Sequence, residues 1–335
     1  MIGTARPLWS RSRWNPTPEQ RRDTVPAVTD QPERRAGTGA QSPGTGGDYD
    51  PAAIPVREAA TVLIVDERPD LQVLMLKRNA RSVFVGDMWV FPGGAVDDAD
   101  RHPDIEDLVE GWSDESASLR IDQPSGGLGF WVAALRETFE EAGLLLAGEP
   151  GFDDLVPLEP GSERFDHHRD GLNAGAIDFS SILRSEGLTM RAAEMHYVSQ
   201  WVTPLGPPRR YDTRFFVTER PSSQVPLHDD DEAVHHEWMS ATDAIEANEA
   251  GDMVMMTPTV AMLKRLATFG SVDEAMASAA AAGPADDEAV RIRFDDDGPH
   301  RIAFPADEDY EHADPKVEHG IISWPAGSLP PPGPR

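Results

Sequence analysis

The segment from residue 130 to residue 146, FWVAALRETFEEAGLLL, constrains the fold most, because its pattern fits one kind of element only. Its large apolar residues recur every three or four positions, which predicts an amphipathic helix buried on one side. That apolar face consists of Trp131, Leu135, Phe139 and Ala142. A glycine-rich entry at 126–129 precedes the helix. A helix of this kind needs a sheet or other helices to cover its apolar face.

The same segment carries three carboxylates, Glu137, Glu140 and Glu141, at positions i, i+3 and i+4. Like charges at this spacing destabilise a helix by roughly 0.2–0.5 kcal/mol per pair. Anions in the last turn before Gly143 meet the negative end of the helix dipole, at a cost of up to about 1 kcal/mol each. Arg136 can offset part of this by pairing with Glu140, and a divalent cation would offset more. The alternative is a solvated helix face that only keeps the protein soluble.

Strand-like runs flank this helix on both sides. The first two, separated by the turn Arg68-Pro69-Asp70, predict a hairpin, and the third ends at the glycine turn Gly93-Gly94. The predicted strands cover 59–67, 71–78, 89–91, 196–204, 211–219, 236–239, 289–294 and 300–304. Capping signals at Ser240, Thr257 and Ser271 predict three further helices. We therefore expect an α+β fold, with helices packed on a mixed sheet in α/β/α layers.

Composition excludes several classes of protein. The chain has no cysteine, which rules out disulfides, zinc–thiolate sites and a cysteine nucleophile. The formal net charge of −29 argues against nucleic acid as a partner. No stretch approaches the ~18 apolar residues of a membrane span. The expected location is cytoplasmic, the expected partner is a small molecule rather than a membrane, and the oligomeric state is left open.

At this point the sequence resembles a known family. RETFEEAGL at 136–144, with FPGG at 91–94, resembles the Nudix box: Gly, five residues, Glu, seven residues, then Arg-Glu-aliphatic-x-Glu-Glu-x-Gly-aliphatic. An insertion splits the box in this chain. In this respect the chain is similar to the coenzyme A diphosphatase-like branch of the family, which is related to the mammalian nineteenth Nudix member. Further matching segments are MWVFPGGAVDDAD, WVTP with RRYDTRFF, and HHEWMSATDAI.

The chain departs from the family pattern in two ways. Thr138 stands in the aliphatic place. The family leaves 14 positions from the first glycine to the arginine, whereas Gly94 to Arg136 is 136 − 94 = 42, an excess of 28. The residue eight positions before Arg136 is Leu128 rather than Glu, and one of Asp97, Asp98 or Asp100 is the candidate replacement. We expect the inserted segment to be a displaced loop, with a lid over the site as the alternative.

The resemblance implies a domain organisation and a Nudix-type sandwich with extra helices in its insertions. We expect a disordered arm at 1–50, a Nudix hydrolase domain at 51–283, and a partly disordered C-terminal extension at 284–335. The insertions within the domain are expected at about 95–129 and, with two or three short helices, at about 150–195.

The resemblance also implies a chemistry: metal-dependent hydrolysis of a diphosphate linkage in a small molecule, most simply coenzyme A or acyl-coenzyme A. Glu137, Glu140 and Glu141 are then the ligands of Mg²⁺ or Mn²⁺, both of which prefer oxygen ligands. Arg136 orients a glutamate, and the Gly93-Gly94 backbone contributes to the site.

The remaining site residues follow from basic and acidic clusters. Glu232, in the acidic loop 228–232, is the expected general base, with a solvated hairpin tip as the alternative reading of that loop. Arg78 and Arg81 form one candidate substrate-binding cluster, and Arg209 and Arg214 belong to a second; both would bind phosphate by charge-assisted hydrogen bonds. His235 and His236 are expected to be structural.

Two other functions remain open at this stage. The same chemistry could act on ADP-ribose, nucleotide sugars or dinucleotides. A catalytically silent Nudix-fold domain that binds or senses a ligand is an alternative of a different class. The glutamate triad argues against silence, because a sensor has no need of adjacent repelling carboxylates.

Overall fold

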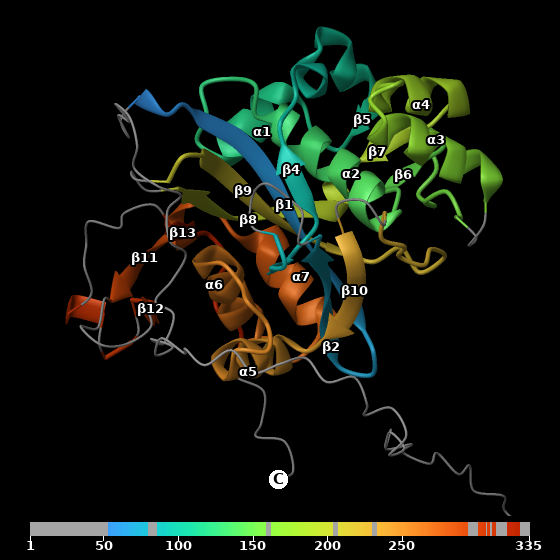
Figure 1. The fold of residues 1–335 in the computed structure, drawn as a ribbon. Coiled ribbons are helices and arrows are strands. Elements are labelled where there is room, and N and C mark those ends of the chain that lie inside the picture. The colour runs from blue at the N-terminus through green and yellow to red at the C-terminus, as the bar shows by residue number, and fades with distance from the viewer. Residues whose placement is uncertain are drawn as a thin grey trace, which may run out of the picture. The chain divides into compact units, whose positions relative to one another are not determined.

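A mixed β-sheet lies at the centre of the structure, a computed structural model that describes residues 53–79, 86–158, 162–203, 207–229, 233–293, 301–305, 307–308, 310–312 and 320–328 (Figure 1). Its strands are β1 Val56–Glu67, β2 Leu71–Arg78, β3 Trp89–Val90, β4 Gly93–Ala95, β8 Met195–Val202, β9 Arg210–Glu219, β10 Ala233–Met239, β11 Glu288–Arg293, β12 Arg301–Ala303 and β13 Gly320–Ile322. They run in the order β10-β2-β1-β9-β8-β13-β11-β12, with β3 paired to β2 and β4 to β1. The predicted arm at 1–50 lies outside the described residues.

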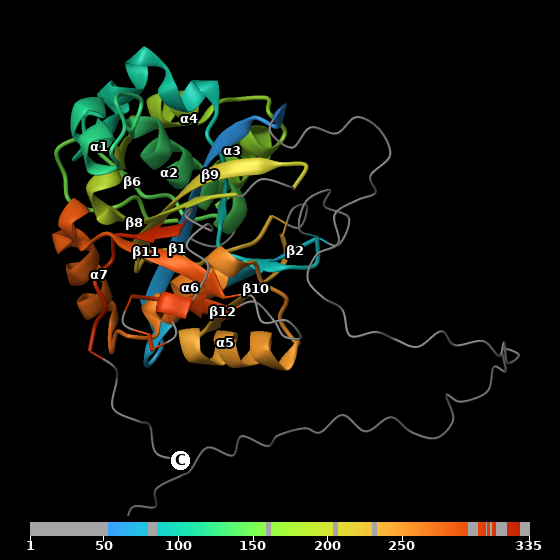
Figure 2. The same cartoon turned by 90° about the vertical axis from the view of Figure 1, so that its left-hand side faces the viewer.

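Seven α-helices, five short 3-10 helices and a small second sheet complete the described part of the chain. The helices are α1 Asp114–Arg120, α2 Leu128–Ala142, α3 Glu163–Asn173, α4 Phe179–Glu186, α5 Ala241–Ala250, α6 Thr257–Leu266 and α7 Val272–Ala281. The small sheet consists of β5 Val109–Glu110, β7 Thr189–Arg191 and β6 Ala147–Gly148. Figures 1 and 2 show α1 to α4 on one face of the main sheet and α5 to α7 on the other. The expected α+β fold in α/β/α layers is confirmed.

Strand β1 is central, and its neighbours explain its composition. It pairs antiparallel with β2 through the predicted hairpin and parallel with β9, from Val56 opposite Arg210 to Val65 opposite Glu219. Its alternate side chains enter two separate cores: Val62 and Ile64 pack toward α2, whereas Leu63 and Val65 pack toward α5 to α7. A strand buried on both faces needs an almost continuous apolar run, as this one has.

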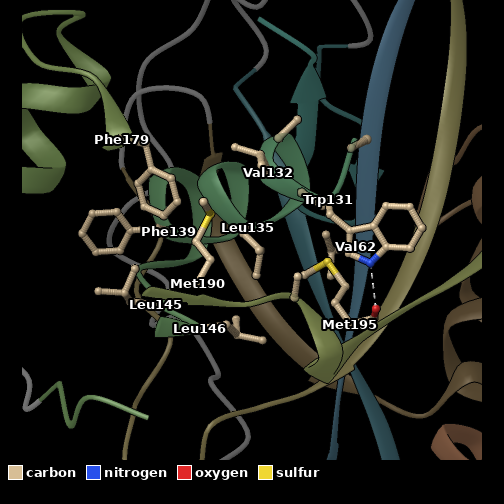
Figure 3. Packing of buried hydrophobic residues seen from close by; sticks show 14 of the residues in the cluster. Val62, Trp131, Val132, Leu135, Phe139, Leu145, Leu146, Phe179, Met190 and Met195 are labelled. Carbon is tan, nitrogen blue, oxygen red and sulfur yellow. Dashed lines mark hydrogen bonds between the residues drawn. The ribbon is translucent and has the colours of Figure 1, made fainter. Parts of the chain in front are cut away.

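Helix α2 fills the first core with the apolar face predicted for it. Trp131 and Phe139 are almost fully buried, and the indole Nε1 of Trp131 donates a 3.0 Å hydrogen bond to the carbonyl of Met195 (Figure 3). The helix is shorter than predicted, since it ends at Ala142 and not at residue 146. Gly143 takes the left-handed conformation with φ 66°, and its N–H bonds back to Phe139. Glycine adopts this conformation without steric cost, so it stops the helix.

One expectation about the segments around the core is wrong. The insertion at 95–129 is not a displaced loop: its apolar residues Ile105, Leu108, Ala117 and Ile121 are buried in the α2 core. The domain boundary at 283 stays a prediction, and strands beyond it belong to the main sheet, because β13 pairs with β8 and β11 pairs with β13. Trp324 is fully buried against Phe269, at a ring distance of 4.9 Å. The C-terminal segment thus covers apolar surface that α6 and α7 would otherwise expose.

Candidate active site

The glycine turn before the insertion forms one wall of the site. Strand β4 pairs with β1 so that Gly94 lies opposite Ala60. A Cβ on Gly93, whose φ is 154°, would lie 2.3 Å from the carbonyl oxygen of Ala60, and a Cβ on Gly94 would lie 2.3 Å from Oε1 of Glu137. Both positions therefore require glycine, because the β1 backbone and the Glu137 carboxylate approach too closely for any side chain.

The three glutamates on α2 make different contacts. Glu137 and Glu141, one turn apart, lie against the glycine turn: Glu137 beside Gly94, and Glu141 accepting a 2.8 Å hydrogen bond from the N–H of Gly93. Glu140 pairs with Arg136 at 3.1 Å, through the same Nη1 that also donates to Glu137. Among the residues that the structure describes, no three acidic or histidine side chains form a group that could hold a metal ion. The ligand set predicted from the sequence therefore stays a proposal.

Arg136 is the centre of a buried charge network. Its Nη1 donates to Glu137 at 2.8 Å and to Glu140 at 3.1 Å, and its Nη2 donates to the carbonyl of Ala95 at 2.8 Å. Asp100 receives two further bonds, from Nε at 3.0 Å and from Nη2 at 2.9 Å. This bidentate geometry is the strong form of an arginine–carboxylate pair. The predicted orienting role of Arg136 fits these contacts.

The position of Asp100 shows where the inserted segment interrupts the Nudix box. Counting from Gly94, five residues separate it from Asp100, which is the family spacing to the upstream glutamate. Only 2% of Asp100 is exposed, and it faces Arg136. The insertion therefore follows Asp100, and a count backwards from Arg136 finds Leu128 because it crosses the inserted residues. Counting forward from the glycine would have selected Asp100 from the three candidates.

Thr138, the second departure from the box, is accommodated inside the helix. Its hydroxyl donates a 2.7 Å hydrogen bond to the carbonyl of Ala134, one turn earlier, and the side chain is fully buried. A buried hydroxyl needs such a partner, since leaving it unpaired would cost about 1–3 kcal/mol. Threonine thus replaces an aliphatic residue without an unsatisfied group.

The electrostatics of the site are dominated by burial of the carboxylates. Desolvation raises the pKa of Glu137 to about 8, although the neighbouring Arg136 opposes this shift. Burial also raises the pKa of Glu140, again against the effect of Arg136. A buried carboxylate with a raised pKa is one whose negative charge lacks full compensation. Such a site favours the binding of a cation.

Arg169 on α3 supplies a positive charge that sequence analysis did not find. Its Nε donates a 2.8 Å hydrogen bond to the backbone carbonyl of Glu140, in the last turn of α2. Here it satisfies a carbonyl left over at the helix end and faces the negative pole of the helix dipole. Arg169 lies 33 positions beyond Arg136, so no local pattern connects it with α2.

The predicted substrate-binding arginines do not form a single cluster. Arg78, at the end of β2, lies 3.9 Å from Oε1 of Glu141 and is partly exposed beside the site. Arg209 is exposed in the loop before β9. Arg214 is 1% exposed and stacks on the ring of Phe130 at 5.5 Å, and its role in substrate binding stays a prediction. Arg81 and Glu232 lie outside the described residues.

The start of the acidic loop contains a histidine pair that sequence analysis missed. Nδ1 of His228 lies 2.7 Å from Nδ1 of His236 on β10, and Asp229 accepts a hydrogen bond from the N–H of Ala233. Burial lowers the pKa of His236, and the neighbouring His228 and His235 lower it further. His235 points the other way and packs edge-on against Trp89. The contacts of His235 and His236 agree with the structural role expected for both.

This arrangement of a glycine turn, a glutamate-bearing helix and a mixed sheet is the Nudix fold. A Nudix hydrolase from Alicyclobacillus acidocaldarius has a similar structure, with a TM-score of 0.56 and 25% identity, covering 67% of this chain and 97% of that one. The family described as NUDT19 Nudix domain matches residues 113–266. The chain thus has the Nudix fold and is similar to the NUDT19 branch of Nudix hydrolases. Members of this family generally use divalent metal cations.

Two relatives show the extent of the likeness, and both are named acyl-coenzyme A diphosphatase NUDT19. The Xenopus laevis protein is 25% identical over 235 residues, which cover 61% of this chain and 62% of that protein. The Gallus gallus protein is 29% identical over 267 residues, covering 65% and 70% respectively. The chain thus matches less than two thirds of the length of the Xenopus relative. None of the described helices is long and apolar enough to cross a membrane.

Proposed function

We propose that this protein hydrolyses the diphosphate linkage of coenzyme A or acyl-coenzyme A with the help of Mg²⁺ or Mn²⁺. Water would attack one phosphorus of the P–O–P linkage and break its bond to the bridging oxygen, which leaves with the other phosphate, releasing adenosine 3′,5′-bisphosphate and a phosphopantetheine or its acyl derivative. The names of the Xenopus and Gallus relatives support this substrate class. A cytoplasmic location and the absence of a nucleic-acid partner remain predictions.

The charge balance between α2 and the glycine turn is the observation that carries the proposal. Five carboxylates, those of Asp97, Asp100, Glu137, Glu140 and Glu141, share this region with three guanidinium groups, those of Arg78, Arg136 and Arg169. Two negative charges are left over, which is the charge that one divalent cation neutralises. The donors are carboxylate oxygens, the ligands that Mg²⁺ and Mn²⁺ prefer. The residues present therefore fit the cofactor.

Each residue then has a distinct role. Glu137, Glu140 and Glu141 would hold the cation, which when bound polarises the phosphoryl oxygens and lowers the pKa of the attacking water. Arg136 positions Glu137 and Glu140 through its hydrogen bonds. The absence of a side chain at Gly94 leaves room for the Glu137 carboxylate against the glycine turn.

Proton transfer and substrate binding are assigned to the periphery of this centre. Glu232 remains the predicted general base, in the loop that Asp229 joins to β10. Arg78 is placed to meet a substrate phosphate, because its guanidinium lies beside Glu141 and is partly exposed. Arg81 and Arg209 are predicted to contribute further positive charge. These charges matter because the protein as a whole repels anions.

The decisive experiment combines a substrate panel with a binding measurement. Coenzyme A, acetyl-coenzyme A, ADP-ribose, NADH and a nucleotide sugar are incubated with purified protein and Mg²⁺ or Mn²⁺, and products are separated by chromatography. Mn²⁺ binding is measured in parallel by electron paramagnetic resonance. Substitution Glu141→Gln should weaken Mn²⁺ binding and lower kcat at least 100-fold. The control Glu115→Gln, at an exposed position on α1, should change neither.

The outcomes separate the three functions under consideration. Cleavage of coenzyme A compounds supports the proposal. Cleavage of ADP-ribose or nucleotide sugars alone would replace it with the second diphosphatase function. Mn²⁺-independent ligand binding without any product would favour the silent binding domain. Wild-type rates in the Glu140→Gln, Glu141→Gln double variant would contradict the metal assignment itself.

A further inference from the structure

Building on the proposed function, we infer that a cavity beside α2 binds the branched aliphatic part of coenzyme A that is attached to the diphosphate. In coenzyme A, a single methylene separates the phosphate oxygen from a carbon that carries two methyl groups. A carbon with a hydroxyl and then an amide follow. The cavity thereby selects coenzyme A over diphosphates whose second half is a sugar or another nucleoside.

The cavity has a volume of about 150 Å³, and side chains from both insertions form most of its lining. Its apolar lining consists of Ala99, Ile105, Val132, Leu172, Ile177 and Phe179. Ile105 comes from the segment inserted into the box, Ala99 lies just before that segment, and Leu172, Ile177 and Phe179 come from α3, α4 and the loop between them. A Nudix domain without these insertions would lack most of this lining. The insertions therefore have a structural reason to determine which substrate is bound.

The cavity lies beside the catalytic residues, on the same helix. Val132, Arg136 and Glu140 all line it, and they follow one another at intervals of four residues on α2. Side chains at this spacing share one face of a helix. The cavity therefore extends along α2 from an apolar end at Val132 to the carboxylate of Glu140. A group bonded directly to a diphosphate held near Glu140 can reach it, whereas a distant acyl chain would have to fold back.

Charge determines which half of coenzyme A enters. Four carboxylates line the cavity, those of Asp97, Asp100, Glu140 and Asp178, against the single guanidinium of Arg136. The excess negative charge repels the adenosine half, which carries a third phosphate. It accepts the other half, which is uncharged and can donate hydrogen bonds from its hydroxyl and amide to carboxylates.

The apolar lining separates coenzyme A from the competing diphosphates. The second half of ADP-ribose or of a nucleotide sugar is a polyol, and its hydroxyl groups that face Ile105, Phe179 and Leu172 rather than the carboxylates would lose water without gaining partners. Burying a hydroxyl without a hydrogen bond is unfavourable, whereas burying two methyl groups is favourable. The same surface thus favours one substrate and disfavours the others.

The test measures kcat/KM for coenzyme A, for a coenzyme A analogue that lacks the two methyl groups, and for ADP-ribose. The wild-type protein should prefer coenzyme A to the analogue by about tenfold, the usual effect of removing apolar groups from a fitted pocket. Ile177 is 37% exposed at the rim, so it can be changed with little risk to folding. Ile177→Trp should fill the cavity and lower kcat/KM for coenzyme A at least tenfold, with ADP-ribose changed less than twofold.

A second variant and a control keep the result interpretable. Ile177→Ser should reduce the ratio of kcat/KM for coenzyme A to kcat/KM for the analogue without the two methyl groups, while leaving Mn²⁺ binding unchanged. This variant replaces Ile177→Trp in the test if Ile177→Trp fails to fold. Leu119→Ser, at an exposed apolar position on α1, should behave as wild type. Equal kcat/KM for coenzyme A and the analogue in the wild-type protein would overturn the inference and leave the proposed function intact. No cleavage of any coenzyme A compound would overturn both.

Discussion

Asp100 offers the sharpest test of the buried charge network. We consider its replacement by alanine, which removes the bidentate partner of Arg136 and leaves the guanidinium with Glu137, Glu140 and the carbonyl of Ala95. Asp100 is 2% exposed, and its two bonds to Arg136 measure 3.0 and 2.9 Å. Water cannot easily replace them at this depth.

The expected cost follows from these two contacts. Hydrogen bonds to charged groups contribute about 1.5–3 kcal/mol each, and breaking a buried ion pair costs about 3–5 kcal/mol. Because Arg136 keeps two other carboxylates, we expect a value near the lower end, about 3 kcal/mol. For a domain of this size that corresponds to a fall in Tm of about 6–10 °C. It would be a large fraction of a typical stability of about 5–15 kcal/mol.

Urea unfolding followed by tryptophan fluorescence measures this change, with Asp98→Ala as the matched control. Asp98 lies in the same turn, two residues earlier, and is exposed. Its variant should unfold at the same urea concentration as the wild type, whereas Asp100→Ala should unfold at a clearly lower one. Equal midpoints for the two variants would refute the assignment of Asp100 as the replacement for the upstream glutamate of the box.

Two further predictions concern Glu137 and its neighbour Gly94. The folded-state pKa of Glu137 is raised from 4.5 to about 8, so the folded protein holds a proton there that the unfolded chain releases, and the free energy of unfolding should fall as pH rises from about 5 to 8. In metal-free buffer, urea titrations of Glu137→Gln should lack this part of the decline; an identical pH slope in both proteins would contradict the burial argument. Gly94→Ala should displace the Glu137 carboxylate and lower kcat at least tenfold, because the new Cβ would lie 2.3 Å from Oε1 of Glu137. The control Gly283→Ala should keep wild-type kinetics, because a Cβ at residue 283 would have no neighbouring atom within 4 Å.

Local sequence patterns predicted most helices and strands of this fold, because each pattern depends on interactions between residues that are close in the sequence. The spacing of Trp131, Leu135 and Phe139 predicted the buried face of α2, and Gly143 marked the residue at which that helix stops. Ser240 and Ser271 cap α5 and α7 as expected, each accepting a hydrogen bond from the N–H three residues later. A helix period, a cap and a left-handed glycine each depend on a few neighbouring residues, so the sequence alone determines them.

Contacts between distant residues explain most of what the sequence missed. Arg214 lies among basic residues along the chain, yet in the structure its guanidinium on β9 stacks on the ring of Phe130. This contact depends on the packing of α2 against the sheet, which the sequence around Arg214 does not show. Strand β13, between β8 and β11, was not predicted at all, because three residues carry too little periodicity to indicate a strand. Its place is decided by the hydrogen-bonding groups that β8 leaves open.

For this protein, the sequence by itself determined the mixed strands and helices, the glycine turn and the helix on which three glutamates sit. Only the tertiary structure decided that Asp100 completes the network of Arg136, that Glu141 accepts a hydrogen bond from the N–H of Gly93, and that Arg169 caps α2. It also decided that the two insertions line one cavity. The physical reason is that pairing across 30 or more residues depends on how the intervening chain folds and is buried, which no local pattern records.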